Sequence, residues 1–238
     1  MRLDNYLVSN GFFESRNKAQ YEIKNENVLV NKKTITKASF DVAENDLVEI
    51  ISDSTLKYVS KGGLKLERAL DYFSINPLNL SCLDIGSSTG GFTDCLLKRG
   101  AKEVYAVDTG TNQLHESLRS NEKIHLYENT NFLKMDLDIL KDIKLITIDV
   151  SFTKVEPILE RVIKSFKDVT VVFLIKPQFE LGQVYLKGGV VREESLRNKV
   201  KTQILDFLKS YNIKTNEIID SPILGGSGNK EYLTYIKV

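Results

Sequence analysis

From Leu80 to the C-terminus, short runs of β-branched and aliphatic residues alternate with longer segments whose apolar residues recur at helical spacing. This alternation predicts an α/β domain with a seven-stranded, mostly parallel sheet and right-handed crossover connections. Ligands of such sheets bind at the carboxyl ends of the strands, near the point where the strand order reverses. We expect strands at 80–85, 103–107, 124–127, 145–149, 170–175, 214–219 and 232–237, and helices at 63–73, 91–99, 112–119, 154–166 and 194–210.

A glycine-rich loop follows the first strand of this domain, and Asp84 lies just before it. An acidic residue, Asp108, ends the next strand, where a carboxylate can accept both ribose hydroxyls of a nucleoside. Because Asp84 would repel a pyrophosphate, the pattern favours a cationic ligand over a dinucleotide. The segment from Asp84 to Phe92 resembles motif I of class I (Rossmann-like) methyltransferases, which implies S-adenosylmethionine as the cofactor. The candidate cofactor-binding residues are Asp84, Gly86, Ser88, Gly90, Gly91, Phe92, Asp108, Asn131 and Asp149.

The fourth and fifth expected strands end on an acid and a base, Asp149 and Lys176. Parallel strands point the same way, so we expect these side chains to converge beside the cofactor site. A buried lysine is costly unless it is paired or its pKa falls. A partly neutral lysine could remove the proton of a ribose hydroxyl as its oxygen attacks a sulfonium methyl group. The alternative is a structural ion pair that holds two strand ends together.

Other methylation chemistries are less well supported. Cys82 and Cys95 fall inside an expected strand and helix, whereas methylation of a base carbon favours a cysteine nucleophile beside the target. Methylation of an amino group favours an Asp/Asn-Pro-Pro-aromatic motif, but the chain has Asp149-Val150-Ser151-Phe152.

The first 54 residues form a separate module with the pattern helix, helix and short strands, and its first 39 residues carry seven basic residues against four acidic ones. Arg2-Leu3-Asp4, Ser15-Arg16 and Val28-Leu29-Val30-Asn31 resemble the S4 RNA-binding fold, a small α+β domain, although Lys32 stands where that family usually has glycine. Basic side chains near helix N-termini suit phosphate groups. The alternative is a solvated basic helix. Across the chain, the candidate RNA-binding residues are Arg2, Arg16, Lys18, Lys32, Lys33, Lys37, Lys61, Lys187 and Arg192.

Asp149 and Lys176 also match the Lys-Asp-Lys-Glu tetrad of FtsJ-like 2′-O-ribose methyltransferases. That resemblance implies Lys65 and Glu231 as the outer members, with Lys61 as an alternative for the first position. Together with Lys187-Gly188-Gly189-Val190-Val191-Arg192, these motifs resemble the TlyA/hemolysin A family over essentially the whole chain. The resemblance implies 2′-O-methylation of cytidine in ribosomal RNA. The chain resembles the shorter form of the family, which is restricted to the 23S RNA of the large subunit. The 187–192 loop would hold RNA or close over the site; otherwise it is a flexible connection.

Composition limits the alternatives. The chain has 33 basic and 32 acidic residues, but residues 40–53 contain five carboxylates and no base, so charge is segregated rather than evenly spread. Two cysteines and two histidines at unrelated spacings predict neither a disulfide framework nor a metal site. No secretory leader or apolar run of spanning length is visible, so we expect a cytoplasmic protein without a membrane partner.

We expect an S4-like domain at 1–54, a linker at 55–62 and a methyltransferase domain at 63–238. Three other functions remain open: a nucleoside-cofactor dehydrogenase, a non-enzymatic S4 ribosome-binding protein and a haemolytic pore-former. The loop sequence disfavours the first, the intact tetrad disfavours the second, and no segment indicates the third.

Overall fold

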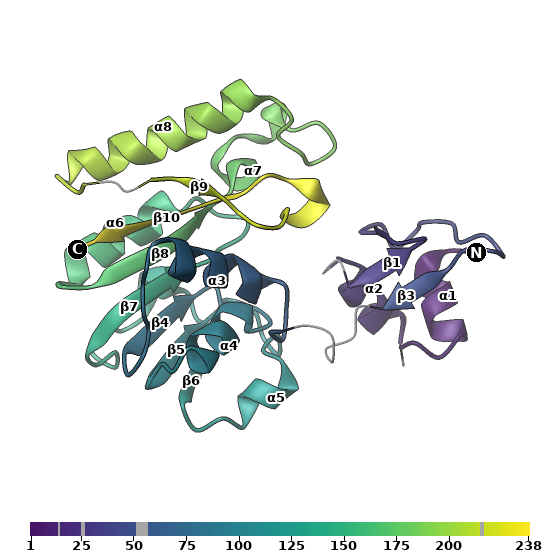
Figure 1. The fold of residues 1–238 in the computed structure, drawn as a ribbon, viewed down its shortest axis with the longest axis horizontal. Helices are drawn as coiled ribbons and strands as arrows, with labels where there is room; N and C mark the ends of the chain where they lie inside the picture. Colours follow the sequence, from purple (N-terminus) through teal and green to yellow (C-terminus); the bar gives the residue numbers. More distant parts are fainter. Residues whose placement is uncertain (14, 25–26, 51–56, 215–216) are drawn as a thin grey trace. The chain divides into compact units, whose positions relative to one another are not determined.

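The computed structural model describes residues 1–13, 15–24, 27–50, 57–214 and 217–238 (Figure 1). The chain divides into two compact units, the first containing Met1–Leu56 and the second containing Lys57–Gly225 and Asn229–Val238. The expected domain boundary at residue 54 and the first residues of the expected linker lie outside the described residues. These boundaries therefore stay predictions.

The first unit packs two helices, α1 (Leu3–Ser9) and α2 (Arg16–Lys24), with a small antiparallel sheet. The sheet has the order β2-β1-β3, formed by β1 (Val28–Val30), β2 (Lys33–Thr34) and β3 (Val48–Ile50). Its core is made of side chains from both helices and two strands: Leu3, Leu7, Ala19, Ile23, Val28, Val30, Val42 and Val48. This is the helix–helix–strand order that the sequence predicts.

The turn between β1 and β2 keeps its left-handed geometry without glycine. Asn31 and Lys32 have φ values of 52° and 63°. The Asn31 side chain donates to Asp46 and accepts from the Leu47 N–H, at 2.7 and 3.0 Å. These bonds offset the conformational cost that Lys32 carries in place of glycine.

The second unit is built on a seven-stranded sheet with the order β6-β5-β4-β7-β8-β10-β9. The strands are β4 (Ser81–Ile85), β5 (Glu103–Val107), β6 (Ile124–Tyr127), β7 (Ile143–Ile148), β8 (Thr170–Ile175), β9 (Ile219–Asp220) and β10 (Tyr232–Lys237). Pairs from β6 to β8 are parallel, and β10 runs antiparallel to both β8 and β9. The strand order reverses between β4 and β7, so a ligand site is expected at their carboxyl ends.

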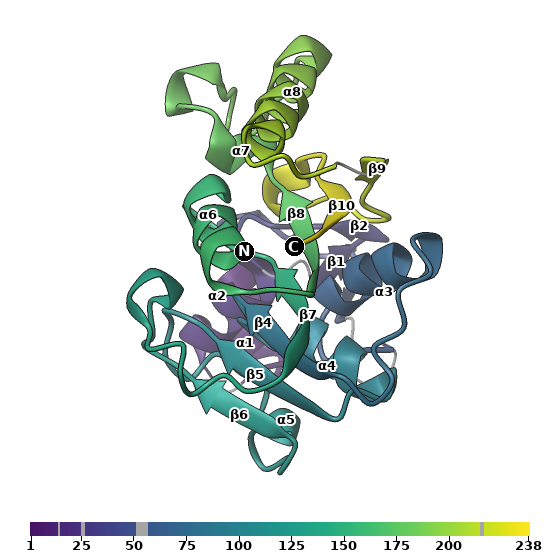
Figure 2. The ribbon, with the colours of Figure 1, turned by 90° about the vertical axis from the view of Figure 1, so that its left-hand side faces the viewer.

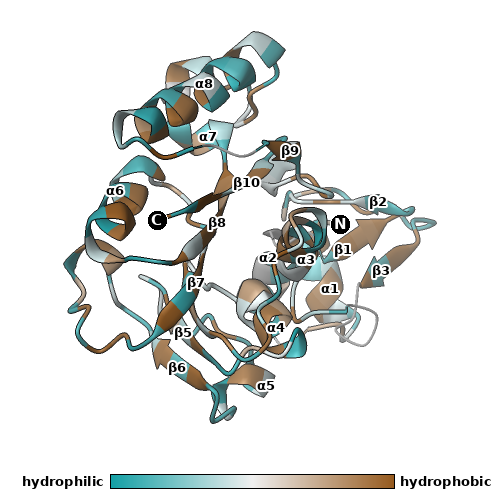
Figure 3. Cartoon of the chain, turned by 60° about the vertical axis from the view of Figure 1, so that its left-hand side comes forward, coloured by the Kyte–Doolittle hydropathy of each residue, from teal (hydrophilic) through white to brown (hydrophobic). Residues whose placement is uncertain are grey.

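Helices cover both faces of this sheet (Figure 2). The helices are α3 (Gly62–Tyr72), α4 (Gly91–Lys98), α5 (Glu116–Arg119), α6 (Glu156–Ser165), α7 (Pro177–Glu180) and α8 (Glu194–Ser210), with 3-10 turns at Phe132–Lys134, Gln183–Tyr185 and Gly226–Gly228. Helices α3 and α4 pack on one face, and α6 and α8 on the other. The central strands read as continuous hydrophobic runs because both faces are buried (Figure 3).

Two expected elements are shorter in the structure, and one helix was not expected. The expected helix 112–119 is reduced to α5, because Asn112 is left-handed (φ 55°) and the His115 ring caps the helix by accepting from the Ser117 N–H. The expected strand 214–219 is reduced to β9, with residues 215–216 outside the described part. The short helix α7 was not expected. Among the described residues, no helix has the length and apolar character needed to cross a membrane.

Candidate active site

The loop after β4 lies against the end of β7. Gly86 is left-handed (φ 85°), its N–H donates to the Val107 carbonyl at 2.8 Å, and a Cβ there would lie 2.6 Å from the Asp149 carbonyl oxygen. Only glycine fits this approach without a shift of the backbone. Gly90 and Gly91 open α4, and Ser88 is also left-handed (φ 46°). The carboxyl ends of β4, β5 and β7 therefore meet around this loop.

Asp108 shapes the same loop from the end of β5. Its two carboxylate oxygens accept from the backbone N–H groups of Ser88 and Gly110, at 2.8 and 2.7 Å, and the side chain is half-buried. Asn131 is exposed, and its side-chain oxygen accepts from the Leu133 N–H at 2.9 Å. The cofactor contacts expected of Asp108 and Asn131 stay predictions.

Two other predicted cofactor residues have their side chains inside the protein. Asp84 is fully buried and accepts from the hydroxyls of Thr93 and Thr147, at 2.6 and 2.9 Å. Burial raises the pKa of Asp84 to about 7, and its hydroxyl partners only partly oppose that effect. Phe92 packs in the core between α3, α4 and the sheet. Both side chains are therefore buried in the core next to the loop.

Asp149 and Lys176 meet as the strand directions predict. The Lys176 ammonium lies 2.5 Å from the Asp149 carboxylate and donates to the Ser151 hydroxyl at 3.0 Å. Lys176 is the N-cap residue of α7, directly after β8, and Asp149 directly follows β7. The pair thus joins two neighbouring strand ends at the edge where the cofactor loop lies.

Lys65 and Glu231 form a second buried ion pair, with 2.6 Å between the Lys65 ammonium and Glu231 Oε2. Lys65 comes from the first turns of α3, and Glu231 directly precedes β10. Lys61, the alternative for this position, is the N-cap residue of α3. The contact to Glu231 therefore favours Lys65 as the outer lysine.

The two pairs are coupled electrostatically through Asp149. Burial alone would raise the pKa of Asp149, but the positive charges of Lys176 and Lys65 outweigh it and lower that pKa. Asp149 is thus held as a carboxylate between two lysines. The four residues come from α3, β7, β8 and β10, which are far apart in sequence.

Sequence reasoning missed three neighbours of the pairs. Ser151 accepts from Lys176, and Gln178 donates to Glu231 Oε1 at 2.8 Å. Phe152 is 83% exposed, left-handed (φ 63°) and packed on Phe179 with ring centroids 5.0 Å apart. The available signal was sequence spacing: Ser151 and Gln178 each lie two positions after a predicted site residue, Asp149 and Lys176 respectively.

Comparison with protein families identifies the catalytic unit. Residues 58–238 match the FtsJ-like methyltransferase model, and residues 1–48 match the S4 domain. The chain belongs to the FtsJ-like methyltransferases. Within them it belongs to the hemolysin A/TlyA family, and it is a methyltransferase with an N-terminal S4 domain.

Curated relatives match along nearly the whole chain. Hemolysin A of Brachyspira hyodysenteriae is 41% identical, covering 99% of both chains. The 23S rRNA (cytidine-2′-O)-methyltransferase TlyA of Campylobacter jejuni is 39% identical, covering 99% of this chain and 98% of the relative. The 16S/23S rRNA (cytidine-2′-O)-methyltransferase TlyA of Mycobacterium tuberculosis is 33% identical, covering 99% and 89%.

A solved structure shares both the sequence pattern and the fold. A candidate hemolysin from Streptococcus thermophilus is 36% identical, with a TM-score of 0.75, covering 99% of this chain and 87% of that chain. The predicted fold class, a seven-stranded Rossmann-like methyltransferase domain preceded by an S4 domain, is confirmed.

In this methyltransferase, the 187–192 segment is an anchored hairpin. Lys187 and Val190 pair across a turn in which Gly188 and Gly189 have positive φ. The buried Asn229 side chain accepts from the Val191 N–H and donates to the Gly189 carbonyl, at 3.0 and 2.9 Å. Arg197 of α8 donates to the Val191 and Arg192 carbonyls. These bonds hold the segment in one conformation, and Lys187 and Arg192 are exposed on it.

In the S4 unit, two of the predicted RNA-binding residues pair with one buried acid. Asp4 is fully buried, and Arg2 and Arg16 each contact its Oδ2 at 2.9 Å. Gln20 donates to the same oxygen at 2.7 Å. Lys18 pairs with Glu22 at 3.1 Å. Lys32, Lys33 and Lys37 are exposed on or near the β1–β2 hairpin. Their contacts to RNA stay predictions.

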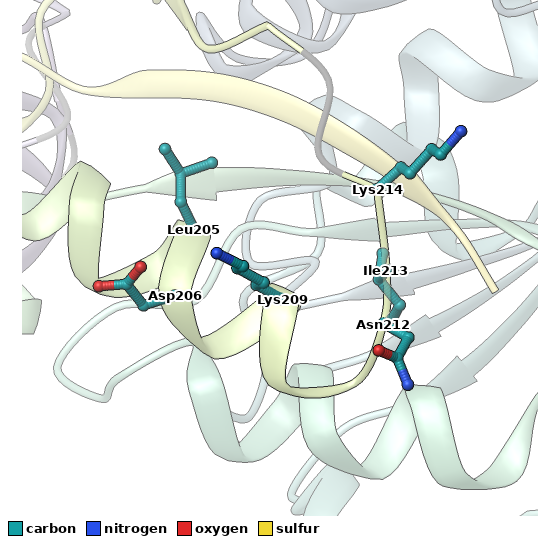
Figure 4. A pocket seen from close by; sticks show the side chains of 6 residues that line it. All are labelled: Leu205, Asp206, Lys209, Asn212, Ile213 and Lys214. Carbon is teal, nitrogen blue, oxygen red and sulfur yellow. The ribbon is translucent and has the colours of Figure 1, made fainter.

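A surface hollow lies away from these sites. It encloses about 500 Å³ at the end of α8 and is lined by Leu205, Asp206, Lys209, Asn212, Ile213 and Lys214 (Figure 4). None of these is a predicted site residue, and its charged lining residues are of mixed sign, one aspartate and two lysines. Within the part of the chain that the structure describes, no cluster of three or more acidic, histidine or cysteine side chains could hold a metal ion.

Proposed function

We propose that this enzyme transfers a methyl group from S-adenosylmethionine to the 2′-hydroxyl of a cytidine in 23S ribosomal RNA, acting in the cytoplasm on the large subunit. One observation carries the proposal: the ion pairs Lys176–Asp149 and Lys65–Glu231 converge beside the loop after β4. The FtsJ-like family match and the rRNA-modifying relatives support the same reaction.

The residues around the loop fit S-adenosylmethionine. Asp108 offers a half-buried carboxylate to ribose hydroxyls, and Asp149 supplies negative charge near a cationic cofactor. The Ser87 hydroxyl in the loop is buried and has no partner among the described residues, so it is free to bond a ligand. When bound, the cofactor supplies an electrophilic methyl group on a sulfonium sulfur.

Lys176 acts as the general base. In its neutral form it would accept the proton of the 2′-hydroxyl as the hydroxyl oxygen attacks the methyl group that a bound cofactor would supply. Asp149 and Ser151 hold the Lys176 side chain at the end of β8 and fix its direction. Asp149 also stabilises the ammonium that forms.

Lys65 and Glu231 organise the other side of the reaction centre. Lys65 provides a positive charge near the attacking oxygen and lowers the pKa of Asp149. Glu231 pairs with Lys65 and keeps its ammonium at the site. The S4 unit and the 187–192 hairpin bind the RNA backbone, through Arg2, Arg16 and Lys18 in the first, and Lys187 and Arg192 in the second.

A second candidate substrate is a cytidine in 16S rRNA in addition to the 23S site. The Mycobacterium tuberculosis relative carries both activities in its name, whereas the Campylobacter jejuni relative carries only the 23S activity. The higher identity to the latter favours the 23S RNA.

The test uses ribosomal RNA and both ribosomal subunits from cells that lack the gene. Purified enzyme and S-adenosylmethionine with a labelled methyl group are incubated with large subunits, small subunits and each naked RNA. We expect label at a cytidine 2′-oxygen of 23S rRNA, and no transfer with Lys176→Ala, which should still bind the cofactor.

Different outcomes would overturn different parts of the proposal. Label on a base or on protein would contradict the reaction, and equal transfer by Lys176→Ala would contradict the role of Lys176. Equal labelling of 16S and 23S RNA would replace the 23S assignment with the dual one.

A further inference from the structure

Gln178 follows one ion pair in the sequence and contacts the other. It is two residues after Lys176 on the short helix α7 and is only 8% exposed. Its amide nitrogen donates to Glu231 Oε1 at 2.8 Å. The helix that begins at Lys176 therefore reaches the second ion pair through Gln178.

The carboxylate of Glu231 is enclosed by its partners. Oε2 contacts the Lys65 ammonium, Oε1 accepts from Gln178, and Gly225 lies so close that a Cβ on it would overlap Oε1. Glu231 is also only 3% exposed. A carboxylate that is satisfied on both oxygens and closed off from solvent acts on the reaction through Lys65.

The other end of the Gln178 amide is not satisfied. Its Oε1 is buried and has no partner among the described residues. A buried acceptor without a partner costs free energy, so this end of the amide adds nothing to the stability of the fold. The contact to Glu231 is what an apolar side chain could not replace.

We infer that Gln178 is a positioning residue for methyl transfer, which holds Glu231 and, through it, the Lys65 ammonium in register with Lys176. The inference rests on the proposed function. It links the four residues of the site into one network: α7 carries Lys176 directly and reaches Glu231 and Lys65 through Gln178. Loss of the amide leaves both ion pairs in place but frees Glu231 and Lys65 to move relative to Lys176.

The experiment measures single-turnover methyl transfer to 23S rRNA in large subunits with Gln178→Met, which keeps the size and removes the N–H donor. We expect the rate constant at saturation to fall about 10- to 100-fold, while KM for both substrates stays within about threefold. Because Glu231 Oε1 loses its donor, we expect the thermal unfolding midpoint to fall slightly, with the variant still folded at the assay temperature. Gln203→Met, an exposed glutamine on α8, is the matched control and should transfer at the wild-type rate.

A double-mutant cycle tests the route through Glu231 and Lys65. If Gln178 acts by holding that pair, Lys65→Met with Gln178→Met should be no more than about threefold slower than Lys65→Met alone. Multiplying effects, or an unchanged rate with Gln178→Met, would overturn the inference. A fall in rate that matches the fraction of Gln178→Met unfolded at the assay temperature would assign Gln178 a structural role instead. If the wild type transfers no methyl group to any rRNA, the proposed function itself fails, which is a separate result.

Discussion

Both units of this methyltransferase contain buried carboxylates that pair with cations, but only the S4 unit exposes those cations to solvent. In the S4 unit, Asp4 is fully buried while the Arg2 and Arg16 side chains are 46% and 54% exposed. In the catalytic unit, the Lys176 and Glu231 side chains are only 9% and 2% exposed. One cluster turns its charge toward solvent, and the other encloses it.

The difference reflects what each cluster is proposed to do. Arginine is always charged and forms forked hydrogen bonds to phosphate, so a buried acid that aims two guanidinium groups outward prepares a phosphate contact. Lysine can lose its proton: burial favours the neutral amine, and a neighbouring carboxylate stabilises the ammonium that forms when it takes up a proton. In the S4 unit the number of charges should matter most, and in the catalytic unit the identity of the side chain.

The largest expected effect comes from Lys176→Arg, which keeps the positive charge beside Asp149. Arginine does not lose its proton in proteins, so it cannot act as the base. We expect methyl transfer to fall about 1,000-fold or more, within the range that general bases contribute. Cofactor affinity, measured by calorimetry, should stay within a few-fold of the wild type.

Retention of more than about a tenth of the wild-type rate by Lys176→Arg would contradict the role of Lys176 as base and leave it a positioning charge. The unfolding midpoint of the variant must be measured alongside, because disturbing a buried ion pair costs up to about 3–5 kcal/mol.

The second prediction concerns Asp84, a buried carboxyl with hydroxyl partners but without a lysine. Burial raises its pKa from 3.8 to about 7. Below about pH 4 the Asp84 carboxyl is protonated in both the folded and the unfolded state. As the pH rises toward 7, the unfolded state loses this proton first, so the free energy of unfolding falls. We expect Asp84→Asn to gain stability relative to wild type by up to about 1.4 kcal/mol per pH unit across this window. Denaturant unfolding between pH 4 and 8 measures it.

Asp149→Asn is the matched comparison, because the lysines lower the pKa of Asp149. A group with a lowered pKa stabilises the fold above its unfolded-state pKa and loses that contribution as the pH falls. The Asp149→Asn variant should thus be less stable than wild type near neutral pH, with the gap closing in acid. If the free energy of unfolding depended on pH in the same way in wild type and Asp84→Asn, the difference inferred between Asp84 and Asp149 would be contradicted.

A third, smaller effect is expected in the S4 unit. Arg2→Gln and Arg16→Gln should each weaken binding to large-subunit RNA about tenfold. Each should also reduce, by about one, the steepness with which the logarithm of the binding constant falls with the logarithm of the salt concentration. Arg16→Lys should lose only about two- to threefold, because it keeps the charge and forfeits the forked geometry. Filter binding at several salt concentrations gives both quantities.

Lys144→Gln is the control for this prediction, because Lys144 is exposed near the start of β7, at the opposite end of that strand from Asp149. An equal loss of RNA affinity in Lys144→Gln would show that overall charge, rather than the Asp4 cluster, determines binding. Rates of transfer at saturating RNA should be unchanged in all of these variants.

The smallest effect is expected at the 187–192 hairpin. Asn229→Ala removes the bonds to Gly189 and Val191 that hold the hairpin, and Arg197 remains to anchor one side. We expect KM for RNA to rise about three- to fivefold with little change in the rate at saturation, since looser phosphate contacts reduce binding to ground and transition states alike. Steady-state kinetics separate the two. A fall in kcat with unchanged KM would instead assign Asn229 to the reaction centre, next to Glu231.

Much of the sheet could be predicted because its strands are buried on both faces and read as continuous apolar runs. The expected strands at 103–107, 124–127, 170–175 and 232–237 coincide with β5, β6, β8 and β10. The helix expected at 112–119 failed because a left-handed Asn112 and a capping His115 are local events that periodicity does not reveal. The short helix α7 was missed because four residues are too few to show a period.

Different parts of the candidate site were predicted from different kinds of signal. The meeting of Asp149 with Lys176 followed from strand direction alone, since neighbouring parallel strands end at the same edge. Lys65 and Glu231 came only from resemblance, because they are 166 positions apart. The buried positions of Asp84 and Phe92 could not be inferred, because a motif names residues without stating which way their side chains point.

The sequence by itself determined the class of sheet, the S4 module and the acid and base at two strand ends, because all three follow from local patterns of hydrophobicity, charge and glycine. Only the tertiary structure decided which cations meet which carboxylates. Asp4 pairs with Arg2 and Arg16, Glu231 pairs with Lys65, and Gln178 donates a hydrogen bond to Glu231. Such pairings depend on distances between chain segments that fold far apart in sequence, and on the burial that makes an unpaired charge costly.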